Sequence, residues 1–330
     1  EMCIRDSYKG KQNLPIKSIC QISQNELCLG TDGKGTKIFN IPKQLITDYP
    51  FDNNYLDSGT SKVHSVLKDN AGNLWIAIYQ KGVMMIPAQP NSFKYIGYKS
   101  INKNIIGSNC ITSLCRDHEG ILWIGTDNDG IYGITTELKQ KVHYAPHDSP
   151  SSVPSTVFGL YEDSEHNLWF GSYTNGLGRL DKKTGQCSYL QNLTDKNGNR
   201  IQRVYDLVED QDKRLWIATM GAGLFYYDLK TGQSVYDPKF NAATKKYKWI
   251  SCLLYAGDNH LYVGTYDGIR CIDLSTDDFK TEEILSRHII HSLYEAPQGN
   301  IWIGNSEGLA EWNPQTQQLK TYTTAHGLSS

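Results

Sequence analysis

The sequence predicts an all-β fold, a β-propeller of seven four-stranded blades built on a repeat of about 46 residues. Two observations predict it. Seven tandem copies keep the same residue types at the same offsets, and each copy divides into four short apolar segments separated by turns rich in Gly, Asp and Asn. No window shows a sustained period of about 3.6 residues, which excludes solenoids of helical repeats.

Each copy is anchored on one residue of its second strand, which is most often tryptophan. The anchors are Cys28, Trp75, Trp123, Trp169, Trp216, Tyr262 and Trp302. Their separations are 47, 48, 46, 47, 46 and 40 residues. Twelve places before every anchor stands a β-branched residue that opens the first strand: Ile16, Val63, Ile111, Val157, Val204, Ile250 and Ile290. Two places after it stands a small residue: Gly30, Ala77, Gly125, Gly171, Ala218, Gly264 and Gly304.

The four strands follow in order. The first, such as Val63–Lys68, has apolar residues at its first and fourth places. Since side chains alternate along a strand, these places are expected on opposite faces, with the strand packed between two layers. The anchor strand, such as Leu122–Gly125, is almost entirely apolar, and its small residue is expected to let the neighbouring sheet approach closely. A third strand such as Leu224–Asp228 and a fourth such as Ser234–Tyr236 complete the blade.

The turn between the first and second strands is predicted to need a positive φ three places before the anchor. That place holds Gly in three copies, Asn in two, and His166 and Lys213 in the others; Lys213 fits poorly. A second glycine, such as Gly130, follows the anchor strand. Aspartates that open the first turn are expected to form it by accepting hydrogen bonds from its backbone. These aspartates are Asp69, Asp117, Asp163 and Asp210.

The repeat sets the domain boundaries. Residues 1–7 resemble a translated sequencing adapter and are left out of the fold. Residues 8–330 are interpreted as seven blades, at about 11–62, 63–110, 111–156, 157–203, 204–249, 250–289 and 290–330. Both ends resemble interrupted repeats, so a piece of a longer protein is expected. Whether the blades form one ring or span two is left open, and the irregular link 87–110 is a candidate junction between two propellers.

The composition excludes several classes of function. The formal net charge of −2 argues against a nucleic-acid or anionic-membrane surface, and no apolar run approaches the length of a membrane span. The eight cysteines show no zinc-finger spacing and are read as small buried hydrophobes. His64 and His291 share a repeat position and His143 and His147 lie four apart, but neither pair has a third ligand at sensible spacing. No metal and no cofactor is therefore expected.

The pattern Asp-x-x-Gly-Asn-Leu-Trp-Ile-Gly-Thr-x-x-x-Gly-Leu resembles the two-component regulator propeller repeat. Its nearest copies are Asp117–Ile131, Asp163–Leu177 and Asp210–Leu224, and the resemblance covers about residues 8–330. The first and sixth copies depart from it, with Cys28 and Tyr262 in place of tryptophan.

This resemblance implies a periplasmic sensor of a hybrid two-component system from gut Bacteroidetes. Such sensors contain two seven-bladed propellers and an Ig-like domain, followed by a membrane span, a histidine kinase and a response regulator. They detect oligosaccharides released from glycans. The expected partners are thus an oligosaccharide, the second propeller and Ig-like domain of the same chain, and a second copy in a homodimer. No kinase motif lies in this sequence, so no catalysis is expected from it.

A ligand is expected on the face that collects the start of each first strand and the turn between the second and third strands. Residue types vary there, and favour aromatic rings, amides, carboxylates and His, a mixture suited to a sugar. The candidate ligand-binding residues are Lys17, His64, Tyr79, Asp127, Phe158, Tyr173, Tyr205, Tyr266 and His291. The alternative for any one of them is an unconstrained position in a loop.

A propeller could also serve two other functions. A carbohydrate-active enzyme, a glycosidase or lyase, would use paired carboxylates roughly 5–10 Å apart. The recurrent aspartates belong to equivalent turns on separate blades, too far apart to cooperate. A protein-interaction propeller of the WD kind is disfavoured because its Gly-His and Trp-Asp dipeptides are missing at the blade positions.

Overall fold

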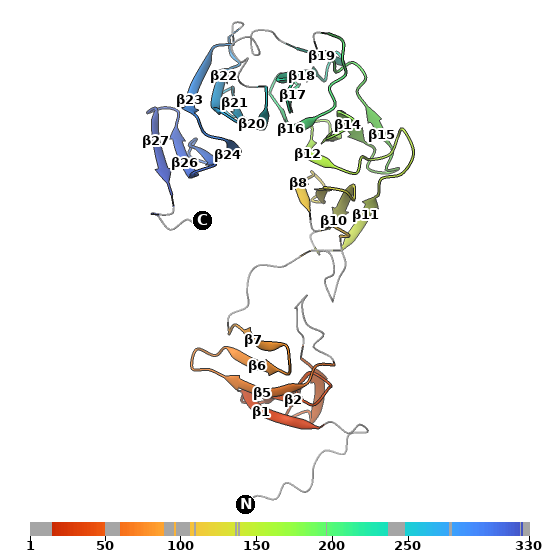
Figure 1. Ribbon diagram of the computed structural model, residues 1–330, viewed down its shortest axis with the longest axis vertical. Coiled ribbons are helices and arrows are strands. Elements are labelled where there is room, and N and C mark those ends of the chain that lie inside the picture. The colour runs from red at the N-terminus through yellow and green to blue at the C-terminus, as the bar shows by residue number, and fades with distance from the viewer. Residues whose placement is uncertain are drawn as a thin grey trace, which may run out of the picture. The chain divides into compact units, whose positions relative to one another are not determined.

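A computed structural model describes residues 15–49, 60–88, 96, 106–108, 110–135, 137, 139–195, 197–236, 248–276, 279–323 and 325. The chain forms two compact units, residues 1–107 and 108–330, and the division falls within the irregular link at 87–110. The first unit contains two blades and the second contains five (Figure 1). The boundaries predicted for blades 1 and 7, and residues 1–7, lie in part or wholly outside the described residues.

In the first unit, blade 1 is a four-stranded sheet and blade 2 has three described strands, each in sequential order. The fourth strand expected in blade 2 falls outside the described residues. Blade 1 consists of β1 (Ile16–Ser23), β2 (Glu26–Thr31), β3 (Thr36–Asn40) and β4 (Leu45–Asp48). Blade 2 consists of β5 (Val63–Lys68), β6 (Leu74–Ile78) and β7 (Gly82–Ile86).

In the second unit all five sheets have four antiparallel strands in sequential order. Blade 3 consists of β8 (Ile111–Arg116), β9 (Leu122–Thr126), β10 (Ile131–Ile134) and β11 (Gln140–Tyr144). Blade 4 consists of β12 (Val157–Glu162), β13 (Leu168–Ser172), β14 (Leu177–Leu180) and β15 (Cys187–Tyr189). Blade 5 consists of β16 (Val204–Glu209), β17 (Arg214–Thr219), β18 (Leu224–Asp228) and β19 (Gln233–Val235). Blade 6 consists of β20 (Ile250–Ala256), β21 (His260–Thr265), β22 (Gly268–Asp273) and β23 (Thr281–Ser286). Blade 7 consists of β24 (Ile290–Glu295), β25 (Ile301–Asn305), β26 (Gly308–Asn313) and β27 (Gln318–Tyr322).

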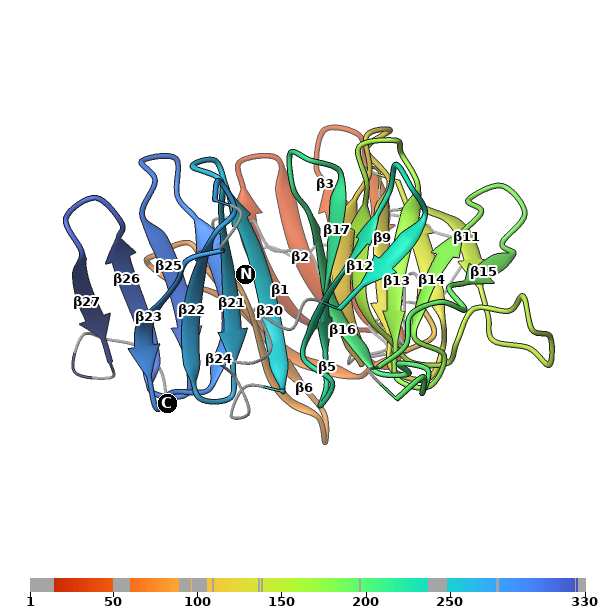
Figure 2. The same cartoon turned by 90° about the horizontal axis from the view of Figure 1, so that it is seen from above.

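Successive first strands of the second unit lie next to one another, β12 beside β8 and so on to β24 beside β20. They line the inner side of the arc of five sheets in Figure 1. Figure 2 shows blades 6 and 7 as neighbouring sheets whose strands run up and down between two edges. The fold is therefore the predicted all-β propeller. No helix in the described part of the chain is long and apolar enough to cross a membrane.

A β-bulge interrupts the first strand of every blade. In blade 2, Val63 pairs with Ile78 and Ser65 with Ala77, so His64 is an extra residue. Val66 then pairs with Ile76, which shares a face with Ile78. The expectation that the first and fourth places face opposite sides is therefore wrong. The extra residue resets the alternation, and both apolar places enter the same core.

The hydrophobic core is made of separate clusters between adjacent blades. One cluster joins Trp123 and Ile131 of blade 3 to Val157 and Phe170 of blade 4, and equivalent clusters fill the next three junctions. A fifth lies between blades 1 and 2. Each anchor packs toward the following blade, so Trp123, Trp169 and Trp216 are at most 3% exposed.

Within its own unit Trp75 does not follow this rule, and the expectation that it is buried is wrong for that unit. Its side chain is 40% exposed there, because no blade of the unit follows blade 2. The small residue after each anchor behaves as predicted. A Cβ at Gly171 would meet the carbonyl oxygen of Val204, which opens the next blade, at 2.6 Å. Only a residue with little or no side chain allows this approach.

The turns between first and second strands confirm the predicted positive φ in six of seven copies. His166 has φ 68°, Lys213 has φ 69° and Asn259 has φ 64°. Lys213 thus adopts a positive φ although lysine rarely does so. Asn25 does not, because blade 1 makes a tighter turn in which Ser23 already pairs with Glu26.

In blades 2 to 5, the aspartate that opens the turn between the first and second strands binds the anchor tryptophan of its own blade. The indole N–H of Trp169 donates to Asp163 at 2.7 Å, and the backbone N–H of Asn167 donates to the other carboxylate oxygen at 2.8 Å. Asp69, Asp117 and Asp210 make the same pair of bonds. We call this end of each sheet the Asp-turn edge. Its aspartates form turns, as the sequence predicts.

Candidate functional site

The opposite end of each sheet brings two variable segments together. Ile111, at the start of β8, pairs with Thr126 at the end of β9, so the turn after β9 lies beside the lead-in to β8. A backbone bond from the Asp127 N–H to the Cys110 carbonyl at 2.9 Å closes this end. The bulge residue of β8, Thr112, lies at this same end of the sheet. We call this end the bulge edge, and it is the face on which the sequence predicts a ligand.

Four of the bulge residues of the second unit are of two kinds. Thr112 and Ser251 are small and donate their hydroxyls to the backbone carbonyls of Val157 and Ile290, each at the start of the following blade. They fasten one blade to the next. Phe158 and Tyr205 are too large for this, and their rings stack on each other with centroids 4.9 Å apart and planes at 27°. A bulge changes the direction in which a side chain points, and in blades 4 and 5 that side chain is an aromatic ring.

Further aromatic rings lie near this pair at the bulge edge of blades 4 to 6. Tyr173 meets Phe158 edge to face, with ring centroids 5.9 Å apart. On the other side, burial and then the neighbouring Tyr266 raise the pKa of the Tyr205 hydroxyl above its ordinary value. Tyr266 meets the indole of Trp249 edge to face at 5.8 Å. We name Phe158, Tyr173, Tyr205, Tyr266 and Trp249 the aromatic platform.

The platform is open to solvent at its outer members. Tyr173 is 41% exposed, Tyr266 is 46% and Trp249 is 43%. The guanidinium of Arg203 lies over the Tyr173 ring, 4.9 Å from its centroid. Exposed rings beside a cation and backbone polar groups can stack on the apolar face of a sugar and hydrogen-bond its hydroxyls.

Four of the five platform rings are among the candidates predicted from the sequence, whereas Trp249 and Arg203 are not. Both residues stand one place before the β-branched residue that opens a blade, Ile250 and Val204 respectively. Their backbone carbonyls accept from the turn after the second strand, which brings them to the bulge edge. The repeat therefore contains the information that would have identified both residues, at the position just before the first residue of each blade.

The other candidates in the second unit lie at the bulge edge but outside the platform. Asp127 accepts a hydrogen bond from the Thr156 hydroxyl at 2.8 Å, so its carboxylate closes the junction to blade 4. His291 is the exposed bulge residue of blade 7.

The three candidates in the first unit are one contacting pair and a separate lysine. The His64 and Tyr79 rings are tilted against each other at 5.2 Å, and Tyr79 is 50% exposed. The Lys17 ammonium lies 3.5 Å from the Asp32 carboxylate.

A carboxyl group lies directly beneath the platform. Asp206 follows the Tyr205 bulge, and its Oδ2 accepts the backbone N–H of Leu253 in blade 6 at 2.8 Å. Its other oxygen accepts the N–H of Leu207 at 2.9 Å. Burial raises the pKa of this carboxyl to about 6, although both backbone bonds oppose the shift. Asp206 thus joins two blades under the rings and titrates near neutrality.

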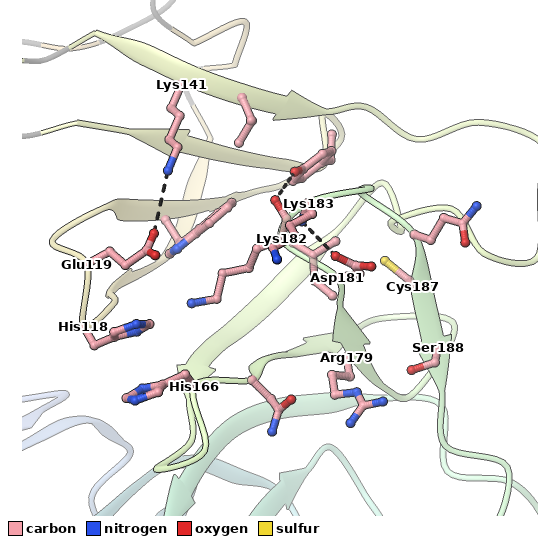
Figure 3. A pocket seen from close by; sticks show the side chains of 16 residues that line it. His118, Glu119, Lys141, His166, Arg179, Asp181, Lys182, Lys183, Cys187 and Ser188 are labelled. Atoms are coloured by element: carbon pink, nitrogen blue, oxygen red, sulfur yellow. Dashed lines mark hydrogen bonds and ion pairs between the residues drawn. The ribbon is translucent and has the colours of Figure 1, made fainter.

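A cavity of about 1100 Å³ opens at the Asp-turn edge, between blades 3 and 4. His118, His166, Lys141, Arg179 and Lys182 line it, together with the edges of Trp123 and Tyr144 (Figure 3). None of the nine candidates lies among its lining residues. Its side chains come from turns and outer strands, where the sequence predicted no site.

Comparison with known proteins agrees with the repeat. Four segments, residues 105–128, 151–174, 195–221 and 284–307, match the model of the two-component regulator propeller family. The first three belong to blades 3 to 5 and the last to blade 7. The chain therefore carries two-component regulator propeller repeats. No curated protein sequence matches it.

Several solved structures share the fold. The extracellular domain of a proposed one-component system from B. thetaiotaomicron is 20% identical with a TM-score of 0.60, over 94% of this chain and 44% of that one. The extracellular domain of a proposed hybrid two-component system from the same organism is 20% identical with a TM-score of 0.56, over 95% and 47%. PorZ, a surface component of the type-IX secretion system of Porphyromonas gingivalis, is 11% identical with a TM-score of 0.54, over 95% and 57%. The chain spans about half the length of each.

Proposed function

We propose that the chain is the ligand-sensing propeller region of an extracytoplasmic receptor of the hybrid two-component type, and that it binds a glycan-derived oligosaccharide. The observation that carries the proposal is the aromatic platform on the bulge edge of blades 4 to 6. The repeats of the two-component regulator family and the likeness to extracellular domains of signalling systems support the sensing role.

The platform suits a sugar better than a protein partner. Its exposed rings belong to consecutive blades and stand next to Arg203, so polar and apolar groups alternate over a short distance. Sugars present the same alternation, with C–H faces that stack on rings and hydroxyls that need hydrogen bonds. A protein-interaction propeller remains the second candidate, with the same face as its contact surface.

Location and partners complete the proposal. A receptor of this type would place the chain in the periplasm, next to a second propeller and an Ig-like domain of the same protein. Signalling would pass through a homodimer to a kinase outside this sequence.

A glycosidase is disfavoured on geometry. Asp163 binds the backbone N–H of Asn167 and the indole of its own blade, and the other three recurrent aspartates do the same. Their oxygens are committed to turn and indole hydrogen bonds on separate blades. Hydrolysis requires two carboxylates flanking one bond.

The test is an array of oligosaccharides prepared from plant and host glycans, probed with the labelled chain and followed by an assay for reducing-sugar release. We expect binding to one class of oligosaccharide and no turnover of it. Sustained release of sugar from the bound oligosaccharide would replace the sensor by an enzyme. Binding to no member of the array would remove the oligosaccharide from the proposal.

A further inference from the structure

The Asp-turn edge contains a repeated hydrogen bond between neighbouring blades. A glutamate near the end of one first strand accepts the backbone N–H of the Asp turn in the preceding blade. The bond runs from His118 to Glu162 at 2.6 Å and from Ser164 to Glu209 at 2.6 Å. Gly257 makes the same bond to Glu295 at 3.3 Å. This bond joins blades 3 and 4, blades 4 and 5, and blades 6 and 7.

The junction of blades 3 and 4 adds two imidazoles to this bond. His118 Nδ1 lies 2.8 Å from Glu162 Oε1, and the rings of His118 and His166 stack with centroids 3.7 Å apart. One ring nitrogen of each histidine and one oxygen of Glu162 all lie within 4.8 Å of one another. Across the residues that the structure describes, no other three His, Cys, Asp or Glu side chains meet this condition.

We propose that His118, Glu162 and His166 bind a divalent transition-metal ion, and that zinc fits them best. Two imidazole nitrogens and one carboxylate oxygen form a donor set that zinc accepts readily. The second oxygen of Glu162 is held by the backbone N–H of His118, which orients the carboxylate as supporting bonds do in metal sites. This site lies on the edge opposite the aromatic platform and does not depend on the proposed sensing function.

The next junction shows what the same positions do without metal ligands. Ser164, Glu209 and Lys213 stand where His118, Glu162 and His166 stand one blade earlier. There the Ser164 hydroxyl donates to Glu209, and the Lys213 ammonium lies 3.4 Å from the same carboxylate. A lysine neutralises the glutamate at that junction. At the earlier junction two histidines stand in those places, and the cation that pairs with the glutamate is Lys182.

Lys182 competes for Glu162. Its ammonium lies 2.5 Å from Glu162 Oε1 and 3.3 Å from Asp117 Oδ2, and Figure 3 shows it extending toward the two rings. A metal ion on Glu162 would repel this ammonium, which keeps Asp117 as a partner. Lys182 therefore lowers the affinity of the site without removing it.

The position of the site suggests two consequences. His118 belongs to blade 3, whereas Glu162 and His166 belong to blade 4, so the ion would link two blades. Three protein ligands leave one tetrahedral position for water or for an oxygen atom of a molecule in the cavity of about 1100 Å³, which both histidines line.

The test is a titration of the chain with zinc ion alone, by competition with a chromophoric chelator. The variants copy residues that the chain itself uses: His118→Ser follows Ser164, and His166→Asn follows Asn259, which has φ 64° where His166 has φ 68°. Both keep the turn. We expect one zinc per parent chain, and about 100-fold weaker binding or more in each variant, because loss of a supporting group alone costs 10–100-fold.

Two further variants sharpen the result. Lys182→Met should bind zinc more tightly than the parent, since the competing ammonium is gone. His288→Ala removes a His–Glu pair, with Nε2 3.2 Å from Glu307, at another surface, and should bind like the parent. Zinc should also raise the unfolding temperature of the parent but not that of the double variant His118→Ser/His166→Asn. The proposal is overturned if the parent binds no zinc in a one-to-one ratio, or if both single variants bind it as tightly as the parent.

Discussion

The two edges of the same sheets follow different rules. At the Asp-turn edge, Asp69, Asp117, Asp163 and Asp210 each bind the tryptophan and the turn of their own blade in one geometry. At the bulge edge, the equivalent places hold a hydroxyl in one blade and a stacked ring in the next. The contacts of the uniform edge stabilise the blades, and the varied edge is where we propose that a ligand binds.

The largest effect expected at the uniform edge is the loss of a buried anchor. Trp169→Ala should lower the free energy of unfolding by roughly 3–5 kcal/mol, because Trp169 is 3% exposed and packs on blade 5. Trp75→Ala is the matched control, since this anchor keeps its aspartate bond but is 40% exposed, and should cost clearly less. Urea unfolding measures both. If Trp169→Ala unfolded at the same urea concentration as the parent, the packing of this anchor between blades would be contradicted.

Removing the aspartate should cost somewhat less than removing the anchor. Asp163→Ala leaves the Trp169 indole and two turn N–H groups without their acceptor, at about 2–4 kcal/mol. Asp195 accepts the equivalent turn bonds from Asn197 and Asn199 in an exposed loop without a tryptophan. Asp195→Ala should therefore cost about 1 kcal/mol or less. Equal losses in the two variants would mean that the indole bond contributes nothing.

Beneath the varied edge, Asp206 should make stability depend on pH. Burial raises its pKa from 3.8 to about 6 in the folded chain, so the folded state binds the proton more tightly than the unfolded state. The resulting stabilisation is complete below 3.8 and is lost as pH rises through about 6. Asp206→Asn keeps an acceptor for Leu253 without the charge. Relative to the parent, it should gain about 1–2 kcal/mol between pH 4 and pH 7. If the difference in unfolding free energy between Asp206→Asn and the parent does not change with pH, Asp206 is not the titrating group.

The sequence predicts the uniform edge well because each of its contacts lies within one repeat. Asp163, Asn167 and Trp169 stand at fixed short spacings, and both the turn and its aspartate bonds follow from them. The bulge was missed because apolar residues at the first and fourth places look the same with or without an extra residue between them. Only the pairing of Val63 with Ile78 and Val66 with Ile76 reveals it.

Contacts between blades were harder to predict. His118 and His166 stand at different offsets from their anchors, and they meet only because the turns of blades 3 and 4 are neighbours. Trp249 and Arg203 were overlooked although each precedes the first residue of a blade. The exposure of Trp75 could not be foreseen, because the repeat gives no sign of where a compact unit ends.

At the varied edge, we expect changes that affect binding and leave stability nearly intact. Tyr266 is 46% exposed and Tyr205 is a bulge residue, so Tyr266→Ala and Tyr205→Ala should each cost about 1 kcal/mol or less in unfolding free energy. Losses as large as that of Trp169→Ala would make the aromatic platform part of the core.

The most direct test of a ligand site on the aromatic platform is calorimetry with the oligosaccharide that the array selects, on the parent, Tyr205→Ala, Tyr266→Ala and Tyr294→Ala. Tyr294 is 62% exposed but pairs with Trp302 within its sheet, away from the bulge edge. We expect the first two variants to bind at least tenfold more weakly, about 1.4 kcal/mol, and Tyr294→Ala to bind like the parent. If Tyr205→Ala and Tyr266→Ala both bind as tightly as the parent, the ligand site is not on the aromatic platform.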